Sequence, residues 1–362
     1  MIERSPRISG QGPADLRSGR LELRSGRLEL RAGRLELRAG PLDLRSGRPD
    51  LRSGPRGLSA AGKREWSPLF GGSPGILPAA AMIFPSEAPL TSQAYDFIAN
   101  LVYEHSRIRL GPDRQTLVAG RLRQRLQALQ IDDYADYCAL LKSPQGADEI
   151  DALIDLISTN HTHFFRESSH FDLLTRQLLP RLAEKSIAGM RPLRFWCAAS
   201  SSGEEVYSLA IVLAEFCRLR PALQWHIEAS DISQRMLERC QQAIYDADKV
   251  SVPQPEWLER YFLRGIGDRD GYFRVKNELR RQVTVRYVNL FQDVYPVPRG
   301  LDVIFCRNVM IYFDVPSRNT LIERLSDQLA PGGFLFVGHS ESLIGLRHGL
   351  RTIAPSVYMR PE

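Results

Sequence analysis

The sequence predicts an α/β protein: an all-helical N-terminal domain followed by a mostly parallel sheet that carries a small antiparallel β insertion. Three patterns predict this architecture. Between residues 91 and 158, apolar side chains recur at helical spacing. From residue 193 onward, short apolar strands alternate with helical segments, which is typical of a parallel sheet. At about residues 268–287, apolar and polar residues alternate on both sides of a turn, as in an antiparallel β-ribbon.

Residues 1–81 differ from the rest in composition. Residues 16–57 repeat a seven-residue unit, first LRSGRLE, and every unit contains a glycine. A seven-residue period would suit a coiled coil, but these glycines and three prolines in the later units oppose a helix. We therefore predict a disordered, low-complexity heptad-repeat tail over residues 1–81.

Chain length, composition, charge and cysteine count limit the class of protein. The chain has 362 residues and 43% hydrophobic content, enough for two domains with their own cores. Residues 1–81 hold 15 of the 48 Lys and Arg but only 8 of the 42 Asp and Glu, so the net charge of +6 belongs to the tail. The remainder is close to neutral, and we expect no nucleic-acid partner. The five cysteines form no C-x-x-C pair and no apolar run reaches eighteen residues, which predicts a cytoplasmic protein with reduced thiols and no membrane insertion.

Residues 82–158 are predicted to form the all-helical domain. Its second helix, over about residues 114–130, carries the arginines Arg114, Arg121, Arg123 and Arg125 on adjoining faces. Such a stripe is either a solvated face or a docking face for an acidic helical partner, and the residues alone do not decide between them.

Residues 159–190 are predicted to be a linker and a helix leading into the second domain, residues 191–362. The linker contains His161 and His163, but no Cys, Asp or Glu lies at ligand spacing, so we predict no metal. Phe164 and Phe165 are expected to be buried, holding Arg166 in place.

The first βα turn of the second domain carries the clearest chemical signal. A strand ends in small residues, and a helix then begins near Gly203 with Glu204 and Glu205. Ligands bind at this end of a parallel sheet, but two carboxylates would repel a pyrophosphate. They suit a cationic ligand such as S-adenosyl-L-methionine (AdoMet), with its sulfonium and ammonium groups. The alternative is that they only favour the helix dipole.

Asp231 ends the second strand, twenty-eight residues after Gly203. This is close to the spacing at which a carboxylate accepts hydrogen bonds from ribose hydroxyls. The alternative is that Asp231 caps the helix that begins at Ser233.

Taken together, the motifs resemble those of the chemotaxis receptor methyltransferases, the CheR-type enzymes, over about residues 83–360. The matching pieces are, in order, Asn160-x-Thr162-x-Phe164-Phe165-Arg166, Trp196 to Ser208, Ser230 to Ser233, Asn289-Leu290, Phe305 to Phe313, Pro331 to Gly333 and Gly338 to Ser342. Two positions depart from the family's common residues: Ser200 replaces Cys, and Val206 replaces Pro.

The resemblance implies a Rossmann-like class I AdoMet-dependent methyltransferase sheet and an AdoMet-dependent protein-glutamate O-methyltransferase activity. The expected products are glutamate methyl esters on chemoreceptors and S-adenosyl-L-homocysteine (AdoHcy), with no metal. By the resemblance, the cofactor contacts are Asn160, Thr162, Arg166, Glu204, Asp231, Asn289, Leu290, Arg307 and Asn308. Glu204 would contact the methionine part, Asp231 the ribose and Leu290 the adenine. Arg166 and Tyr312 are the expected catalytic residues, beside the sulfonium and the incoming carboxylate.

The chemistry agrees with these residue types. A glutamate carboxylate is ionised at pH 7, so it needs alignment and desolvation but no general base. A guanidinium and a phenol can hold a carboxylate without removing its proton.

The resemblance also implies partners. The cytoplasmic methylation helices of chemoreceptors would dock on the arginine stripe. Some family members also bind a receptor C-terminal peptide at the edge of the small ribbon. Two alternatives remain: a non-catalytic AdoMet-binding signalling module, and a methyltransferase of another protein or a small acid.

Overall fold

The computed structural model describes residues 21–23, 26–31, 34–37, 89–188 and 190–362, and the chain divides into two units, Met1–Ala79 and Ala80–Glu362. The described strands of the first unit are β1 (Leu21–Leu23), β2 (Gly26–Arg31) and β3 (Arg34–Leu37). They pair antiparallel in the order β1-β2-β3. Each of these three strands contains a Leu-Glu-Leu alternation, and that period of two suits a strand. The prediction of a disordered tail over residues 1–81 therefore does not agree with these three strands. The rest of that prediction lies outside the described residues.

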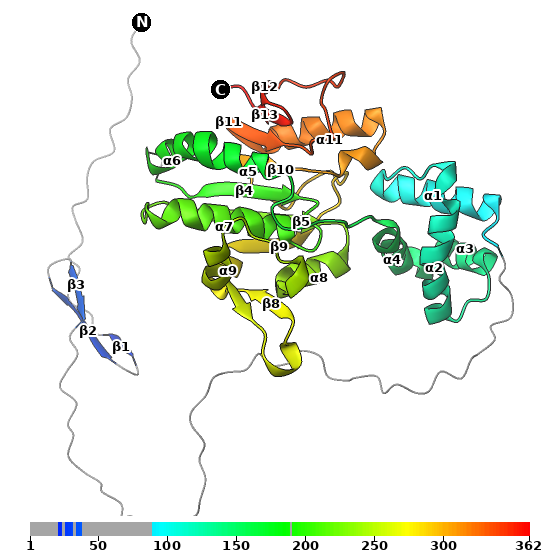
Figure 1. Ribbon diagram of the computed structural model, residues 1–362, viewed down its shortest axis with the longest axis horizontal. Coiled ribbons are helices and arrows are strands. Elements are labelled where there is room, and N and C mark those ends of the chain that lie inside the picture. Colours follow the sequence, from blue (N-terminus) through cyan, green and yellow to red (C-terminus); the bar gives the residue numbers. More distant parts are fainter. Residues whose placement is uncertain (1–20, 24–25, 32–33, 38–88, 189) are drawn as a thin grey trace, which may run out of the picture. The chain divides into compact units, whose positions relative to one another are not determined.

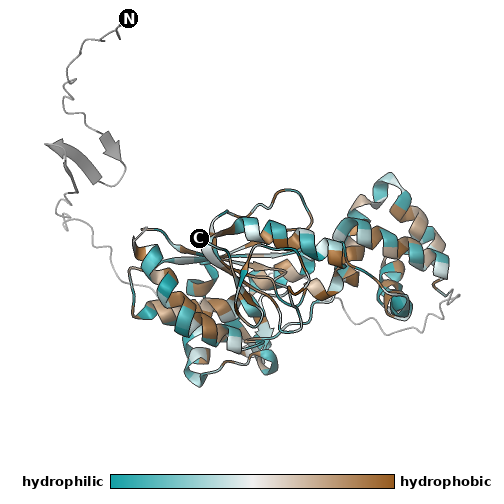
Figure 2. Cartoon of the chain, turned by 90° about the horizontal axis from the view of Figure 1, so that it is seen from above, coloured by the Kyte–Doolittle hydropathy of each residue, from teal (hydrophilic) through white to brown (hydrophobic). Residues whose placement is uncertain are grey.

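The N-terminal domain of the second unit is helical, as predicted. Its helices are α1 (Ser92–Ser106), α2 (Gln115–Leu129), α3 (Tyr134–Lys142) and α4 (Ala147–Ile157), with 3₁₀ turns at Pro112–Arg114 and Pro144–Gly146. Thr91 and Asp133 cap α1 and α3 by accepting backbone N–H groups. Ile98, Leu122 and Leu153 are completely buried between the helices. Figure 2 shows apolar and polar residues on opposite sides of these helices.

A continuous helical stretch follows the helical domain in the sequence and packs in the core of the sheet domain. It consists of α5 (Ser169–Leu173), the π-helical turn η3 (Leu174–Leu178) and α6 (Leu179–Ala188). The prediction of a helix over about residues 168–185 is therefore confirmed, although no sequence pattern indicated the π-helical turn. No helix in the described part of the chain is long and apolar enough to cross a membrane.

The second domain is built on a seven-stranded sheet with the order β12-β13-β11-β10-β4-β5-β9. The strands are β4 (Leu193–Ala198), β5 (Trp225–Asp231), β9 (Val283–Tyr287), β10 (Leu301–Phe305), β11 (Leu329–Phe336), β12 (Arg351–Ala354) and β13 (Val357–Met359). Strands β11, β10, β4, β5 and β9 are parallel, whereas β13 runs antiparallel to β11 and to β12. This arrangement confirms the predicted Rossmann-like methyltransferase sheet.

Helices cover both faces of this sheet (Figure 1). They are α7 (Glu204–Arg218), α8 (Gln234–Gln242), α9 (Pro255–Tyr261), α10 (Asn277–Arg280) and α11 (Val315–Gln328). Successive residues of β4 point to opposite faces. Phe195 and Cys197 enter the core that contains α7, while Trp196 and Ala198 enter the core that contains α11.

The small antiparallel insertion exists, but its predicted position at 268–287 is partly wrong. The insertion is a three-stranded sheet, β6-β8-β7, made of β6 (Ile244–Asp246), β7 (Phe262–Arg264) and β8 (Tyr272–Val275). The second half of the predicted ribbon, β9, lies instead beside β5 as the edge of the main sheet. The alternating pattern identified both strands correctly, but it could not show that β8 pairs with β6 and β7 while β9 pairs with β5, more than fifty residues away.

Candidate active site

A pocket of about 460 Å³ opens at the carboxyl ends of β4, β5 and β10. β4 lies between β5 and β10, and the chain reverses its direction of travel across the sheet here, so this is the switch point where open α/β sheets bind ligands. The volume suits a small molecule. The predicted residues that line it are Asn160, Thr162, Arg166, Asp231, Asn289, Leu290, Arg307, Asn308 and Tyr312, together with Arg114. The structure thus brings together nearly all of the predicted cofactor and catalytic residues.

The turn from β4 into α7 is held in an unusual backbone conformation. Ala199 and Ser201 have φ of 62° and 49°, and Gly203 has φ of 97°. A Cβ on Gly203 would lie 2.7 Å from the Sγ of Cys240, so glycine is required both for its φ and for space. Residues in the left-handed region often mark ligand sites, and this turn lines the pocket.

Of the two acids of this turn, Glu205 lines the pocket, whereas Glu204, the predicted cofactor contact, does not. Glu204 accepts a hydrogen bond of 2.6 Å from the hydroxyl of Ser202. Consecutive residues on a helix point about 100° apart, so only one of the pair can face the ligand. Burial raises the pKa of both carboxyl groups, with Ser202 opposing the shift at Glu204 and Arg307 opposing it at Glu205.

Asp231 lies at the end of β5 with its carboxylate facing the turn after β4. Its two oxygens accept backbone N–H groups from Ser201 at 2.8 Å and Ser233 at 2.9 Å. The cap of α8 is Ser233 itself, which accepts the N–H of Met236. Asp231 is therefore a buried pocket acid rather than the helix cap, and burial raises its pKa.

The loop that carries Arg166 is anchored by its two phenylalanines, as predicted. Phe164 packs edge-on against Tyr245, and Phe165 against Phe171. Arg166 is half-buried and donates a hydrogen bond to the carbonyl of His161 at 2.9 Å. The anchored loop thus holds this guanidinium beside the pocket.

Arg307 is the centre of an ionic cluster under the pocket. Its side chain is 0% exposed. Its Nη2 donates to the main-chain carbonyl of Arg166 at 2.6 Å and to the carboxylate of Glu167 at 2.8 Å. Its Nη1 lies 3.2 Å from the carboxylate of Glu205 but makes no hydrogen bond. We refer to Glu167, Arg307 and Glu205 as the Arg307 cluster.

Glu167 connects three separate segments of the chain. Besides Arg307, its carboxylate accepts the side-chain amide of Asn308 and the backbone N–H of His339, each at 3.1 Å. Burial alone would raise the pKa of Glu167, but Arg307 and these hydrogen bonds lower it to about 2. Glu167 is consequently ionised at neutral pH.

Glu167, His170 and His339 also bring possible metal-ligating atoms within 4.8 Å of one another. The carboxylate is already paired with Arg307, so a cation there would lie against a buried guanidinium. We assign no metal to this group. Burial and the charges of Arg307 and His339 lower the pKa of His170 to about 4, so its ring is neutral at pH 7.

Glu341 fixes the loop that follows β10. Its carboxylate accepts the backbone N–H groups of Asn308, Met310 and Gly338 at 2.6–2.7 Å. Asn308 has φ of 59°, a conformation that these hydrogen bonds help to hold. The same loop continues into the 3₁₀ turn η6 (Met310–Tyr312), so Glu341 helps to place Tyr312.

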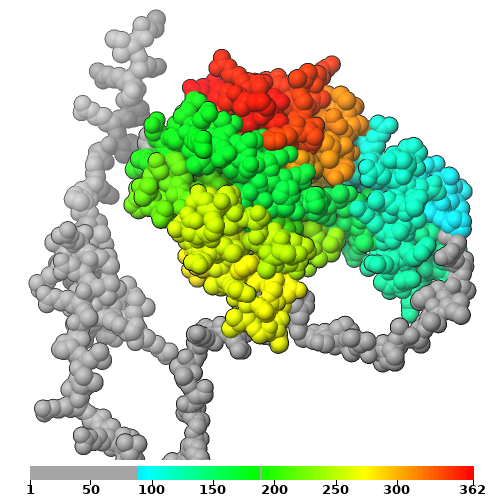
Figure 3. Space-filling model, in the orientation of Figure 1, coloured from blue at the N-terminus to red at the C-terminus, as the bar shows by residue number. Residues whose placement is uncertain are grey.

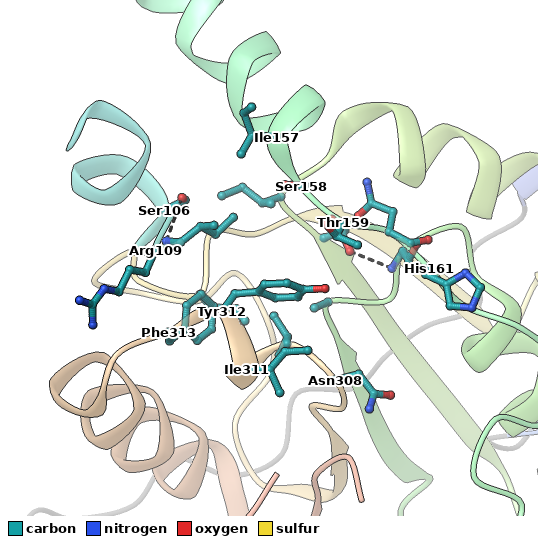
Figure 4. Close-up of a pocket in the computed structure, with 18 of the residues that line it drawn as sticks. Ser106, Arg109, Ile157, Ser158, Thr159, His161, Asn308, Ile311, Tyr312 and Phe313 are labelled. Carbon is teal, nitrogen blue, oxygen red and sulfur yellow. Dashed lines mark hydrogen bonds between the residues drawn. The ribbon is translucent and has the colours of Figure 1, made fainter. Parts of the chain in front are cut away.

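Tyr312 lies across the pocket with its hydroxyl directed toward the segment that carries Thr159 and His161 (Figure 4). Its ring is half-buried and lines the cavity. The backbone N–H of Arg109, in the connection between α1 and α2, donates to the carbonyl of Tyr312 at 2.9 Å. The helical domain therefore contributes directly to the position of this side chain.

Two further hydrogen bonds join the domains beside the pocket. The hydroxyl of Tyr103 donates to Asp314 at 2.6 Å, and the amide of Asn289 donates to the carbonyl of His105 at 2.6 Å. In Figure 3, the cyan residues of α1 lie against the orange residues after β10. Asn289 thus has a structural role in addition to lining the cavity. Leu290 is buried and also lines the cavity.

Two of the four arginines of the stripe, Arg121 and Arg125, are half-buried and bound within the helical domain, and the docking role of the stripe stays a prediction. Arg121 donates to the carbonyls of Leu156 and Ser158 at the end of α4, at 3.0 and 3.1 Å. Arg125 forms a bidentate ion pair with buried Glu149. Helical spacing predicted a shared face but could not show that α4 covers part of it. Arg114 and Arg123 are exposed.

Some pocket residues carried no recognisable sequence signal. Arg109 and Leu117 come from the helical domain, and nothing in their spacing marked them. Others stood beside predicted residues: Ser200 and Ser201 in the β4–α7 turn, and Ile311 next to Tyr312. Glu205 stands next to Glu204, and the sequence pattern does not distinguish which of the two faces the pocket.

The cavity contains polar groups suited to a polar ligand. Among the described residues, the buried Nδ2 of Asn160, Oγ of Ser200 and Nη1 of Arg307 have no hydrogen-bond partner, and all three residues line the pocket. Unpaired buried polar atoms are costly, so they indicate a ligand that supplies partners. Acceptors such as a carboxylate would satisfy the amide and the guanidinium, while the buried acids Glu205 and Asp231 suit an ammonium and ribose hydroxyls. AdoMet has all of these groups.

Comparison with known proteins gives consistent matches. Residues 160–359 match the family described as CheR methyltransferase, SAM binding domain, and residues 93–158 match CheR methyltransferase, all-alpha domain. The chain is 39% identical over 261 residues to the chemotaxis protein methyltransferase of Salmonella typhimurium, covering 72% of this chain and 88% of the relative. It is 38% identical to that of Escherichia coli over the same shares. It is 37% identical over 269 residues to chemotaxis protein methyltransferase 2 of Pseudomonas aeruginosa, covering 74% and 93%.

Proposed function

The chain belongs to the CheR methyltransferase family, and on that premise we propose that it transfers the methyl group of AdoMet to glutamate side chains of chemoreceptors. The products are glutamate γ-methyl esters and AdoHcy, in the adaptation step of a chemotaxis-type pathway. The observation that carries this proposal is the placement of Arg166, Asp231 and Tyr312 on one cavity at the sheet's switch point.

The chain's own residues divide into those that hold AdoMet and those that meet the substrate. AdoMet supplies an activated methyl group on a sulfonium. Asp231 would accept the ribose hydroxyls, and Leu290 would pack on the adenine. Glu205, rather than Glu204, would face the amino group of the methionine part. The unpaired polar atoms described above belong to Asn160, Ser200 and Arg307. The cavity is also lined by Thr162, Asn289 and Asn308.

The incoming glutamate needs orientation rather than deprotonation. Its carboxylate is ionised at neutral pH and acts as the nucleophile itself. The Arg166 guanidinium and the Tyr312 hydroxyl would hold it in line with the methyl group by hydrogen bonds. Ile311 and Phe313, which also line the cavity, would exclude water and strengthen these bonds.

The receptor's methylation helices would approach over the helical domain. Arg109 and Arg114 line the cavity and Arg123 is exposed on α2, so these cations, rather than Arg121 and Arg125, would meet an acidic helix. A receptor C-terminal peptide would add a strand to the edge of the β6-β8-β7 sheet.

The test is methyl transfer from AdoMet with a radiolabelled methyl group to receptor cytoplasmic fragments. A methyl ester predicts label on the receptor that mild base releases as methanol. Label that resists base would indicate a nitrogen or sulfur acceptor, and absence of transfer by a protein that binds AdoHcy would favour a non-catalytic module.

A further inference from the structure

Glu167 does not line the pocket, but its carboxylate binds Arg307 and Asn308, which do. Its side chain is 14% exposed and binds Arg307, Asn308 and the main chain of His339. Its backbone has φ of 54°, in the left-handed region that non-glycine residues rarely adopt. An ionised carboxylate is thus held by the fold in one place behind the cofactor site.

The two acids of the Arg307 cluster are not equivalent partners of the arginine. The Oε2 of Glu167 accepts hydrogen bonds from Nη2 at 2.8 Å and from Nε at 3.3 Å. Glu205 is approached only by Nη1, at 3.2 Å and without hydrogen-bond alignment. Arg307 is committed to Glu167 and to the carbonyl of Arg166, and its charge is only partly available to Glu205.

The charges of the cluster point to a cationic ligand group. One guanidinium stands against two carboxylates, so the cluster has a net charge of −1 when both acids are ionised. Burying an excess carboxylate is unfavourable unless a cation pairs with it. Glu205 faces the pocket, and an ammonium group of the ligand would supply that cation.

We propose that Glu167 is a positioning residue that holds Arg307 away from full pairing with Glu205, and so keeps Glu205 available for the amino group of the bound cofactor. This rests on the proposed function, because it takes AdoMet and AdoHcy as the ligands. Without the charge of Glu167, Arg307 would turn its hydrogen bonds to Glu205, and the ammonium group would lose its acceptor.

The test compares two probes by calorimetry. AdoHcy carries the amino-acid part, whereas 5′-methylthioadenosine keeps the nucleoside and lacks the amino-acid part. We expect Glu167→Gln to weaken AdoHcy binding by about tenfold or more, the range for a lost charge-assisted contact. Methylthioadenosine binding should change by less than about twofold, because Asp231 and Leu290 remain.

Two further variants make the result decisive. Glu205→Gln should weaken AdoHcy binding by as much as Glu167→Gln does. The double variant should bind AdoHcy only slightly more weakly than either single variant, because both substitutions act through the same contact. Glu215→Gln is the matched control: Glu215 is 16% exposed and paired with Arg260, but it lies on α7 outside the pocket lining. It should leave both affinities unchanged.

The possible failures are distinguishable. Equal weakening of both probes by Glu167→Gln would mean that Glu167 only holds the loop, and would overturn the inference. Unchanged AdoHcy binding would overturn it as well. Failure of the wild-type protein to bind AdoHcy would instead contradict the proposed function.

Discussion

Glu205 and Arg307 face each other under the pocket, with the Oε2 of the acid 3.2 Å from the Nη1 of the arginine. The adjacent Glu204 points elsewhere and binds Ser202. This pairing places a carboxylate and a buried guanidinium side by side at the carboxyl ends of β4 and β10. In the proposed cofactor site, Glu205 would meet the ammonium group and Arg307 the carboxylate of AdoMet.

Asp231 should contribute strongly to nucleoside binding. We expect Asp231→Asn to weaken AdoHcy binding by about 1–3 kcal/mol, because a ribose hydroxyl loses a charged acceptor. Isothermal titration calorimetry measures this. Ser233→Ala is the control, because it removes the cap of α8 and lowers stability without altering the pocket acid. If both variants bind AdoHcy equally well, Asp231 has no ribose role.

Tyr312 should affect the chemical step more than cofactor binding. We expect Tyr312→Phe to lower kcat by about 10-fold to 100-fold, since it removes one hydrogen bond to the reacting carboxylate. Its affinity for AdoHcy should hardly change. Tyr261→Phe is the matched control, because its hydroxyl binds Glu215 at 2.8 Å outside the pocket lining. Steady-state kinetics with a receptor fragment would refute the role if kcat were the same for both variants.

The arginines of α2 should separate into two classes. Arg125→Ala removes the cationic partner of the buried Glu149 carboxylate and leaves it only the hydroxyl of Tyr137, so we expect a loss of about 1–3 kcal/mol in the free energy of unfolding. Arg123→Glu should leave stability unchanged but raise KM for the receptor by about threefold to tenfold at low salt. Urea denaturation and methylation kinetics measure the two effects. An unchanged KM for Arg123→Glu would exclude this side chain from docking.

His170 should make the fold less stable in mild acid. Its pKa is about 4 in the folded protein and 6.5 in the unfolded chain, so the unfolded chain binds more protons between these values. Its contribution to the free energy of unfolding is complete above pH 6.5 and falls by about 2 kcal/mol from pH 7 to pH 5. Urea denaturation of the wild type and of His170→Gln at both pH values isolates this loss. Equal losses in both proteins would show that His170 is not responsible.

The sequence predicted the parts of the site that depend on strand ends. Asp231, Arg307 and the β4–α7 turn all follow buried apolar strands, and parallel strands bring their carboxyl ends to one edge. These positions could be predicted from the sequence alone, because each strand and the turn that follows it are contiguous in the chain. The helical domain was equally readable from its 3.6-residue periodicity.

The sequence predictions differ from the structure where contacts with residues far away in the chain decide side-chain orientation or strand pairing. Periodicity places Glu204 and Glu205 on a helix but does not say which way that helix is rotated. Arg121 and Arg125 were visible as a stripe, while the packing of α4 against it was not. Likewise, β9 pairs with β5 rather than β8, a choice fixed by contacts across more than fifty residues.

The most direct measurement is a crystal structure of the protein with AdoHcy bound. The account predicts AdoHcy in the cavity between β4, β5 and β10, with its ribose hydroxyls against Asp231 and its amino group against Glu205. AdoHcy bound elsewhere, or lying in this cavity with its amino group turned away from Glu205, would contradict it.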